Sequence, residues 1–593
     1  MKNFSKLAVM IICLLLTTIF TSACGGGSKA TPPNYPYWLL TQNNQQENNN
    51  QEQNNNQQEE NNNQQEENNQ EEQEPSVEVT LTLTDSLNSE NIAKADIFYK
   101  VESTTKSTDN EDKEILQAEP NVDDNTKFTT TISGTDDPNN VKIKAILTYD
   151  SEENLLDYFS SYDGVEATNG IFDVDFENSK KNKKGFGGGT GTKDDPFIIS
   201  APRHFVNINK KDGEGNYLYL DQNYYFKQTA DIDFTHLTGL KINKAEEDKD
   251  ITVDVINEKA PFYNDGHGIE PIGDYSPIYP VSNHMFQGVY DGDDHIIDGI
   301  VMVNVNKASI GLFSIIVNST VQKLIIGENS IFFFNKFPEW DFQDGNETFK
   351  VVYSDIGTII GTSNESNIEQ CENRAKILIS KAVASEHMVF YLTISSFSRT
   401  YDTNSVKIEN CTNTGNITID SCQIDEEKEN MAPIQIGTFN ASIEGEEITN
   451  RKNNTNEGSI NVTNNKFIKK SEGLYILSGS DKFINKGHII VDNNTNIINI
   501  YTSLNYVKLM NDSTNDGHIT ITNNKLDDGL NNAYIFGTNL LAGSFSNCVN
   551  NGYIFIDNNS GYKIQAAKNI YGNNIEGSTN NGKVTVNGVE GEI

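Results

Sequence analysis

The chain has 593 residues, with 84 Asp or Glu against 45 Lys or Arg, so its formal net charge is −39. A surface this acidic repels nucleic acid and anionic lipid headgroups at long range, so neither is an expected partner, whereas cationic partners and divalent ions remain open. The chain also lacks HExxH, GxSxG and Gly-rich phosphate-loop motifs and any zinc-type Cys/His spacing.

Residues 1–23 have the pattern of an export signal. Lys2 and Lys6 precede an apolar run over residues 7–20, and small residues follow up to Ala23. The run is short, with basic residues before it and small residues after it, which is typical of a cleaved signal and not of a membrane span. We therefore predict a signal peptide that ends at residue 23.

The segment Thr21-Ser22-Ala23-Cys24-Gly25 resembles the lipobox of bacterial lipoproteins, although Thr21 stands where that family usually carries Leu. The resemblance implies that Cys24 is acylated, with chains such as palmitate, and becomes the mature N-terminus. No later stretch is apolar enough to span a bilayer, so this lipid would be the only membrane anchor. We expect a surface-exposed outer-membrane lipoprotein. A periplasmic orientation, and ordinary secretion after cleavage at Ala23, are the alternatives.

Residues 24–75 are predicted to form a disordered stalk. From Gln42 to Glu74 the chain contains only Asn, Gln and Glu, so this tract cannot bury a core. As a random coil it would hold the body roughly 30 Å from the anchor. Gln/Asn tracts also seed β-aggregation, but the interspersed Glu charges argue against that outcome here.

The next 100 or so residues alternate polar and apolar side chains, as strands with one buried face do. Such runs occur at 77–83, 95–101, 127–132, 141–147 and 170–176. Separated by Asp, Asn and Gly turns, they predict an immunoglobulin-like β-sandwich over residues 76–178, without an inter-sheet cysteine pair. We expect it to act as a spacer, with carbohydrate or protein binding as the alternative. Residues 179–190, rich in Lys and Gly, are predicted to be a linker that acts as a hinge.

A different series of motifs begins at Gly189. The blocks are Gly-Thr-Gly-Thr-Lys-Asp-Asp-Pro-Phe-Ile-Ile at 189–199, Thr-Ala-Asp-Ile-Asp-Phe at 229–234, Pro-Ile-Gly at 271–273, Phe-Gln-Gly-Val-Tyr-Asp-Gly at 286–292 and Gly-Leu-Phe at 311–313. In this order they resemble the first rungs of the GLUG-motif β-helix proteins of bacterial surfaces. By motif the resemblance covers about residues 189–327, and beyond that it rests on repeat type. It implies a right-handed parallel β-helix in an adhesin-like setting, and it does not imply an enzyme.

Asp291, Asp293 and Asp294 form an acidic group in the fourth of these blocks. Carboxylate oxygens are the ligands that calcium prefers, so these three residues are weak candidates for a calcium site. Asp291-Gly292 is also a strong tight-turn signal, and turn chemistry explains the group better. No other cofactor is expected.

The later part of the chain repeats one pattern, Asn-x-Gly-x-[Ile/Val]-x-[Ile/Val]. The Asn begins a copy at Asn413, Asn456, Asn485, Asn515, Asn550 and Asn580, and a variant with Ala375 in place of Gly begins at Asn373. Successive copies lie 29 to 43 residues apart, a period typical of stacked repeats. Because no helical period intervenes, we predict an all-β solenoid, a parallel β-helix over residues 191–593.

The repeated Asn and Gly residues are expected to be structural. Alternation along the strand places each Asn inward at a corner, where its amide can bond its own backbone and the amides of neighbouring rungs. The Gly two residues later is expected to form a tight turn, at Gly415, Gly458, Gly487, Gly517, Gly552 and Gly582. A ligand site built on the Asn column is the minor alternative.

Two other residue types recur in register with the repeat. Three cysteines, Cys371, Cys411 and Cys548, each precede a corner Asn by two residues, and we expect small buried thiols there, with a disulfide between Cys371 and Cys411 as the alternative. His488 and His518 are outward neighbours that are expected to stack. They could capture a transition metal, but two imidazoles without a third ligand make a weak site.

Catalysis on a β-helix would require a recognisable set of groups. A glycosidase needs two carboxylates that face one cleft, and the outward positions of the repeated strand form no carboxylate column. Outward aromatic residues, such as Tyr501, Tyr506, Tyr553 and Phe555, could stack on sugars or pack under loops. We therefore expect adhesion or recognition of a host or matrix protein or glycan. A polysaccharide lyase or glycosidase, and a non-binding structural or antigenic protein, are the alternatives.

The end of the rod is the last feature that the sequence leaves open. The final copy of the repeat reaches Val586 and no polar cap follows it. We expect this edge to be covered by a partner or by the chain itself.

Overall fold

The computed structural model describes residues 75–591 except for 87, 103–112, 177–184, 244–250, 276–282, 345–346, 386, 401–405, 426–433, 440–450, 472, 478–480, 498, 527–532 and 573. The predicted signal peptide, Cys24 and the stalk up to residue 74 lie outside the described residues. Within them, no helix is long and apolar enough to cross a membrane.

The first folded unit consists of two four-stranded sheets with the orders β4-β5-β1-β8 and β3-β2-β6-β7. Their strands are β1 (Ser76–Thr84), β2 (Lys94–Val101), β3 (Lys113–Ala118), β4 (Pro120–Asn121), β5 (Asp124–Ser133), β6 (Val141–Tyr149), β7 (Leu155–Glu166) and β8 (Ile171–Asp175). Inward residues of both sheets share one core, which includes Leu81, Ile97 and Phe172. The unit is therefore a β-sandwich, and its immunoglobulin-like classification stays a prediction.

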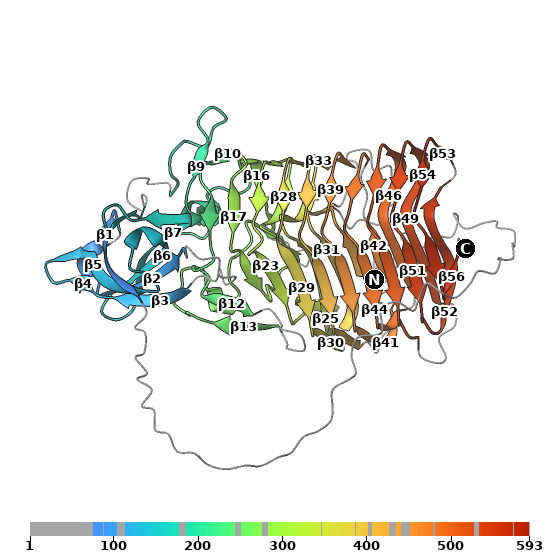
Figure 1. Cartoon of the computed structure of the whole chain (residues 1–593), viewed down its shortest axis with the longest axis horizontal. Helices are drawn as coiled ribbons and strands as arrows, with labels where there is room; N and C mark the ends of the chain where they lie inside the picture. The colour runs from blue at the N-terminus through green and yellow to red at the C-terminus, as the bar shows by residue number, and fades with distance from the viewer. Residues whose placement is uncertain are drawn as a thin grey trace, which may run out of the picture.

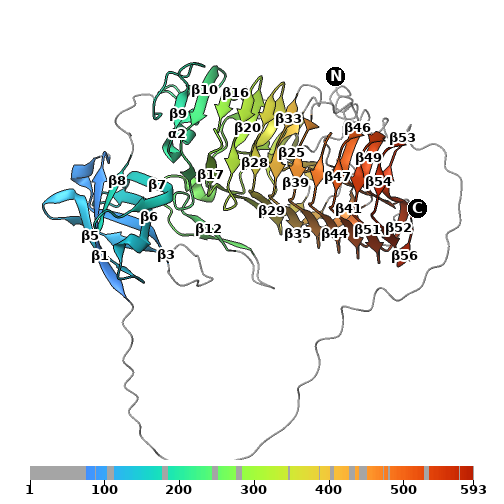
Figure 2. The ribbon, with the colours of Figure 1, turned by 45° about the horizontal axis from the view of Figure 1, so that its top comes forward.

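The rest of the chain winds as a parallel β-helix, which confirms the predicted fold (Figures 1 and 2). Each regular rung supplies one strand to each of several parallel sheets, so every sheet runs along the rod. We call the four largest sheets 1 to 4, in the order in which one rung visits them. The right-handed winding that the resemblance implies stays a prediction.

Sheets 1 and 2 form adjoining sides of the rod. Sheet 1 contains β9 (Phe197–Ile199), β10 (Asn223–Gln228), β16 (Gln287–Asp291), β21 (Thr320–Gln322), β27 (Asn367–Glu369), β33 (Lys407–Glu409) and β38 (Arg451–Lys452). Sheet 2 contains β11 (Ile232–Asp233), β17 (Ile296–Asp298), β22 (Ile325–Ile326), β28 (Glu372–Asn373), β34 (Thr412–Asn413), β39 (Thr455–Asn456), β43 (Ile484–Asn485), β47 (Thr514–Asn515), β50 (Val549–Asn550) and β54 (Thr579–Asn580). The repeated Asn therefore ends each of the last seven sheet 2 strands.

Sheet 3 carries the repeated Ile/Val strand. It contains β18 (Val301–Val303), β23 (Ile331–Phe334), β29 (Lys376–Ser380), β35 (Ile417–Asp420), β40 (Ile460–Thr463), β44 (Ile489–Asp492), β48 (Ile519–Thr522), β51 (Ile554–Asp557), β55 (Val584–Val586) and β56 (Val589–Glu590). Sheet 4 contains β19 (Ser309–Ile310), β25 (Glu347–Gly357), β31 (His387–Ser395), β37 (Ile434–Gly437), β42 (Leu474–Leu477), β46 (Asn499–Asn511), β49 (Ala533–Ser546) and β52 (Tyr562–Tyr571).

Smaller elements fill the corners and flanks. Two short parallel sheets are formed by β20 (Phe313–Val317), β26 (Ile360–Asn364) and β32 (Arg399–Thr400), and by β30 (Val383–Ser385), β36 (Gln423–Asp425), β41 (Lys466–Ser471) and β45 (Thr495–Ile497). The flanking elements are helix α2 (Pro202–Val206), the hairpins β12 (Leu240–Asn243) with β13 (Thr252–Val255) and β14 (Asp274–Tyr275) with β15 (Asn283–His284), and the edge strands β24 (Glu339–Asp344) and β53 (Asn574–Glu576).

The β-helix core begins before the predicted boundary at residue 191. Phe186 is fully buried and its ring stacks on Phe197 at a centroid distance of 4.5 Å. The described end of the predicted linker is therefore part of the first rung and not a free hinge.

The sandwich packs directly against the N-terminal end of the rod. Phe98 and Leu147 of the sandwich share a buried cluster with Leu237 of the β-helix. Arg203 of α2 forms an ion pair with Asp157 of β7 at 2.7 Å, and both side chains are largely buried. The sandwich thus closes this end of the rod, whereas the sequence predicted a spacer on a flexible linker (Figure 2).

The opposite end is partly closed by the chain itself. β56 folds back and pairs antiparallel with β55. β54 is the last strand of sheet 2, and β52 and β53 pair on one side only, with β49. The C-terminal rung therefore keeps open strand edges next to one covered edge.

Candidate ligand-binding face on sheet 4

The outer face of sheet 4 carries one column of side chains that changes character along the rod. The registered positions are Ser309, Asp355, Thr393, Gln435, Tyr475, Tyr501, Phe536 and Ala566. Alternation along each strand sends the next residue inward, as at Ile394, Ile436 and Ile476, which are buried in the core. Because the inward side chains lock each rung, the outer column is held on a rigid scaffold.

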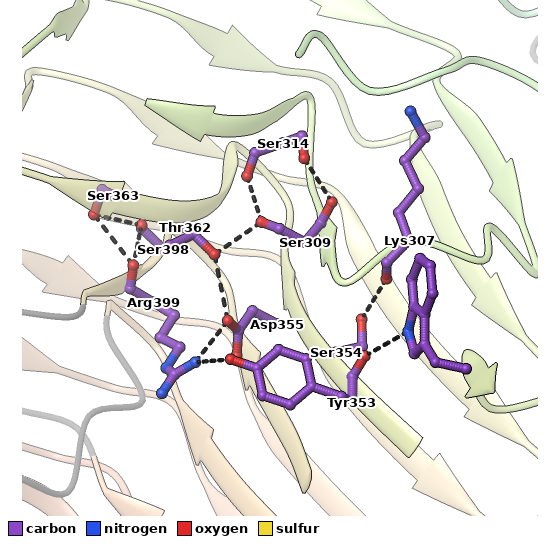
Figure 3. A network of polar contacts seen from close by, with 11 residues as sticks. Lys307, Ser309, Ser314, Tyr353, Ser354, Asp355, Thr362, Ser363, Ser398 and Arg399 are labelled. Atoms are coloured by element: carbon purple, nitrogen blue, oxygen red, sulfur yellow. Dashed lines mark hydrogen bonds and ion pairs between the residues drawn. The ribbon is translucent and has the colours of Figure 1, made fainter. Parts of the chain in front are cut away.

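The first part of this column is a buried polar network (Figure 3). The Oδ2 atom of Asp355 accepts hydrogen bonds from Arg399 Nη1 at 2.7 Å and from Thr362 Oγ1 at 3.3 Å. Thr362 also bonds Ser309, the registered neighbour of Asp355. Burial raises the pKa of Asp355, and the nearby Arg399 guanidinium opposes that rise. This half of the column therefore holds the corner together and does not offer open hydrogen-bonding groups.

Aromatic rings cover the Arg399 side of the network. Its Nη1 donates to the Tyr353 hydroxyl at 3.1 Å, and its guanidinium carbon lies 4.9 Å from the ring centroid of Tyr391. Tyr353 and Tyr391 stack at 5.1 Å with an interplanar angle of 15°. The guanidinium is therefore held from two sides, by the ring face of Tyr391 and by the carboxylate of Asp355.

The second part of the column is aromatic and half-buried. Tyr475 and Tyr501 stack at 4.8 Å with an interplanar angle of 10°, and Phe536 follows 6.1 Å beyond Tyr501. Ring faces that stack along the rod contact each other, so a ligand would meet the ring edges. The side chain of Tyr506, another predicted aromatic contact, lies outside the described residues.

The column carries few charged groups. Among its registered positions the one carboxylate is Asp355, and Arg399 already pairs with it. General acid–base hydrolysis of a glycoside needs two carboxyl groups that face the same bond. The described positions of the column therefore supply an aromatic strip and a single carboxylate, not two.

The corner Asn residues form a continuous ladder of side-chain hydrogen bonds. Nδ2 of each residue donates to Oδ1 of the next, from Asn373 through Asn413, Asn456, Asn485, Asn515 and Asn550 to Asn580, at distances of 2.7 to 2.9 Å. The same Nδ2 atoms also donate to the backbone oxygen two residues later, as Asn413 does to Gly415 at 3.0 Å. The first six are buried, and the five from Asn413 to Asn550 bond an Asn on both sides, so these amides are satisfied within the stack, as the sequence predicts.

The repeated Gly residues are required by close approach between rungs. A Cβ atom at Gly415 would lie 1.8 Å from the backbone oxygen of Ala375, and the other five would meet the preceding rung at 1.9 to 2.0 Å. The six do not adopt the left-handed backbone conformation. The structure therefore gives these Gly residues a different reason from the predicted tight turn. Lack of space between the rungs, and not the backbone angle, excludes a side chain.

A second amide ladder was not predicted. It runs through Asn465, Asn494, Asn524 and Asn559, each donating Nδ2 to the next Oδ1 at 2.9 Å. Each follows an Asn with a positive φ of 52° to 57°, at Asn464, Asn493, Asn523 and Asn558. The recurring Asn-Asn pair just after the sheet 3 strand is the sequence signal that identifies this corner.

The two predicted histidines stack, and the Nδ1 atom of each ring accepts a backbone hydrogen bond. His488 and His518 lie 4.8 Å apart with an interplanar angle of 17°, and Tyr553 stacks on His518 at 3.7 Å. His488 Nδ1 accepts from the His518 backbone N–H at 3.0 Å, and His518 Nδ1 accepts from that of Tyr553 at 3.1 Å. This stack is therefore a surface ladder, and no group of three metal-ligating side chains occurs in the described part of the chain.

The weak calcium candidates lie in a turn. Asp293 and Asp294 have positive φ angles of 48° and 65°, and the Asp293 backbone N–H bonds the Asp291 carboxylate at 3.1 Å. The Asp293 carboxylate is paired with Lys227 at 3.0 Å, and this contact lowers its pKa. Turn geometry and a lysine pair therefore account for the acidic group, as the sequence favoured.

The four described cysteines, Cys371, Cys411, Cys422 and Cys548, are buried free thiols. The possible disulfide between Cys371 and Cys411 is therefore not formed in this structure. Cys411 Sγ instead donates to the backbone oxygen of Glu409 at 3.3 Å, and burial raises its pKa well above the usual value. Burial with a raised pKa makes the thiol unreactive, as expected for a structural residue.

Comparison of the chain with family models, curated proteins and solved structures gave no match. The GLUG-type resemblance therefore stays a prediction from the motifs that carry it. Function is inferred below from the geometry of the rod and from the expected anchor.

Proposed function

We propose that this protein is a lipid-anchored bacterial surface protein that uses sheet 4 of its β-helix to recognise a ligand. The observation that carries the proposal is the partly exposed column on the outer face, in which Tyr475 and Tyr501 stack and Phe536 lies tilted beside Tyr501 on the next strand. Aromatic side chains supply large contact areas at a low entropic cost, and Tyr adds a hydroxyl that can bond.

The ligand class is a host or matrix protein or a glycan. A lipid at Cys24 and a polar tract up to Glu74 would hold the rod away from the membrane, where it can meet large ligands. The strongly acidic chain disfavours nucleic acid and supports neutral or cationic surfaces as targets. Adhesion is therefore the activity that the anchor, the stalk and the aromatic strip support together.

A glycan and matrix-protein array probed with the purified protein tests the recognition step. We expect saturable binding, and Tyr501→Ala should weaken it at least tenfold because it removes the centre of the aromatic strip. Tyr553→Ala is the matched control, because Tyr553 is an exposed aromatic on a different side of the rod. Cleavage of any glycan would indicate an enzyme instead. Absence of binding to every component of the array would indicate a non-binding coat protein.

Metabolic labelling with an alkyne analogue of palmitate tests the anchor separately. The wild-type protein should incorporate the label, and Cys24→Ala should abolish it and release the protein from the membrane fraction. Protease treatment of intact cells then distinguishes a surface-exposed protein, which is cleaved, from a periplasmic one. An unlabelled wild-type protein in the medium would indicate ordinary secretion.

A further inference from the structure

The C-terminal rung is the open end of the rod. β54 ends sheet 2, and β53 pairs only with β49 of the preceding rung. The N-terminal end, by contrast, is closed by the sandwich through the Arg203–Asp157 ion pair and a shared apolar cluster. Among the described residues, β11 and β19 are also terminal strands of their sheets, but the sandwich packs against that end of the rod, whereas no folded unit packs against the C-terminal rung (Figure 1).

The Asn ladder has a direction, and its donors point to this open end. The assignment of each amide is fixed because its Nδ2 also donates to a backbone oxygen two residues later, as Asn550 does to Gly552 at 3.1 Å. Asn580 accepts from Asn550 at 2.9 Å and from the Gly582 backbone N–H at 3.2 Å. Its own Nδ2 is exposed and has no acceptor among the described residues.

A second amide in the same rung lacks an acceptor and is buried. Asn539 Nδ2 donates to Asn569 Oδ1 at 2.9 Å, which places Asn569 one rung closer to the open end. Asn569 is 1% exposed, and its Nδ2 has no hydrogen-bond partner. A buried donor without an acceptor is unfavourable, and a further rung would supply the missing carbonyl as Asn569 does for Asn539.

Apolar side chains are also uncovered at this end. Ile575 is 49% exposed, although Phe545, its registered neighbour in the preceding rung, is buried at 2%. Val589 is exposed to the same degree. The interior of the solenoid is therefore uncovered where the donors lack acceptors.

From these observations we propose that the C-terminal rung is a strand-addition site, which binds an extended polypeptide segment of a partner protein. The neighbouring edge shows the mode, because β56 already pairs antiparallel with β55 through Val586 and Val589. The added segment would pair with β54 and β53, present a carbonyl oxygen to Asn580 and cover Ile575. This site is distinct from the sheet 4 face and does not depend on the function proposed for it.

A second copy of the chain fits this end less well. Its N-terminal end is occupied by the sandwich, so head-to-tail stacking of rods is blocked. Its C-terminal end would bring the Asn580 donors of two chains against each other, without acceptors between them. An extended polypeptide avoids both problems because its backbone alternates donors and acceptors at strand spacing.

The test uses a synthetic peptide with the sequence of residues 513–522, which already forms part of a rung and contains Asn515. Labelled peptide is titrated with the full chain and followed by fluorescence anisotropy. We expect saturable binding with one peptide per chain. A peptide with Gly517→Ala is the matched control and should bind at least tenfold more weakly, because a Cβ atom at Gly517 meets the preceding rung at 2.0 Å.

A protein variant locates the site. Asn580→Asp keeps the oxygen that accepts from Asn550 and removes the terminal donor on an exposed residue, so the fold and its thermal midpoint should not change, whereas peptide affinity should fall about fivefold. Tyr501→Ala should leave peptide binding unchanged, which separates this site from the sheet 4 face. Equal binding of both peptides, the absence of saturation, or a concentration-dependent dimer in sedimentation experiments would overturn the proposal.

Discussion

The first and the last rungs of the rod fill the same corner with different residue types. The inward position at the end of sheet 2 is Ile232, Ile297 and Ile326 in the first three strands, and it becomes Asn at Asn373 and remains Asn to the end. The first rungs fill their interior with aromatic rings, such as Phe286 and Phe313 at a centroid distance of 4.9 Å. The last rungs fill theirs mainly with Ile and Val.

The difference shows how the two parts are stabilised. Aromatic rings of different shape fill an irregular interior, and such packing tolerates rungs of unequal length. An amide ladder instead requires each rung to place one atom at hydrogen-bond distance from the next, so it enforces a regular stack. The aromatic end is also sealed by the sandwich, and the regular end stays open.

Surface charge follows the same regularity. Along the end of the sheet 3 strands, Asp420, Thr463, Asp492, Thr522 and Asp557 occupy registered positions. Asp therefore alternates with Thr, and each Thr hydroxyl donates to the preceding Asp, at 2.6 Å for Thr463 to Asp420. This arrangement lets an acidic chain stack without carboxylates on adjacent rungs, where like charges repel.

The largest effect is expected at the sealed end. Arg203→Met leaves the Asp157 carboxylate buried without its partner and should lower the free energy of unfolding of the sandwich–rod unit by about 3–5 kcal/mol. Lys259→Met is the control, because Lys259 and Glu153 bridge the same two parts at 2.8 Å on the exposed surface, and it should leave the free energy of unfolding almost unchanged. Denaturant unfolding measures both. Equal effects would show that burial does not distinguish these two pairs.

The amide ladder should come next. Asn485→Ala removes the bonds to Asn456, Asn515 and Gly487 and should cost about 2–4 kcal/mol. Asn485→Ile, which restores the residue type of the first rungs, should not recover this loss because Asn456 Nδ2 still lacks its acceptor.

The control for the ladder is Asn551→Ala, which breaks an exposed amide contact to Asp516 and should change stability by less than about 0.5 kcal/mol. Thermal midpoints of the three variants provide the comparison. A stable Asn485→Ile variant would show that aliphatic and amide corners are interchangeable.

Close approach between rungs is tested by two buried glycines. Gly487→Ala places a Cβ atom 2.0 Å from the Gly458 oxygen and should destabilise the protein by about 1–3 kcal/mol. Gly537→Ala should be tolerated, because its nearest atom lies at 3.5 Å and its registered neighbour is already Ala567. Denaturation midpoints distinguish them. A tolerated Gly487→Ala would mean that the rungs separate at little cost.

The smallest effect is a pH dependence at the histidine stack. Burial, followed by the charge of His488, lowers the pKa of His518 below 6.5 in the folded protein. The unfolded chain therefore binds the proton more readily, so the contribution is complete above pH 6.5 and is lost as the pH falls through the folded pKa. The thermal midpoint should drop less between pH 7.5 and 5 in His518→Gln than in the wild type. His284→Gln, a histidine outside the stack, serves as control.

Much of the rod could be predicted because its constraint repeats. Asn485 and Gly487 recur with the same spacing in other rungs, so one local pattern indicated both the stack and the inward amide. The second ladder at Asn494 had an equally regular signal, in the Asn-Asn pairs. It was missed because Asn in a polar turn is common for local reasons, and only the stacked register shows that these amides face inward.

Long-range contacts could not be predicted from repeats. Arg203 and Asp157 are 46 residues apart and belong to different folded units, and neither lies in a recurring pattern. The same holds for Asp355 and Arg399, whose pairing depends on how sheet 4 turns at its corner. The sequence accordingly predicted a hinge where the structure has a packed interface.

The sequence alone determined the class of fold, because side-chain alternation and the rung period are local properties that any rung must repeat to bury its neighbours. Tertiary structure decided the rest: which outer column becomes an aromatic strip, which end the sandwich closes and which end stays open. Those features depend on contacts between rungs and between folded units. Such contacts contribute to the free energy of folding only after the chain has formed the β-helix.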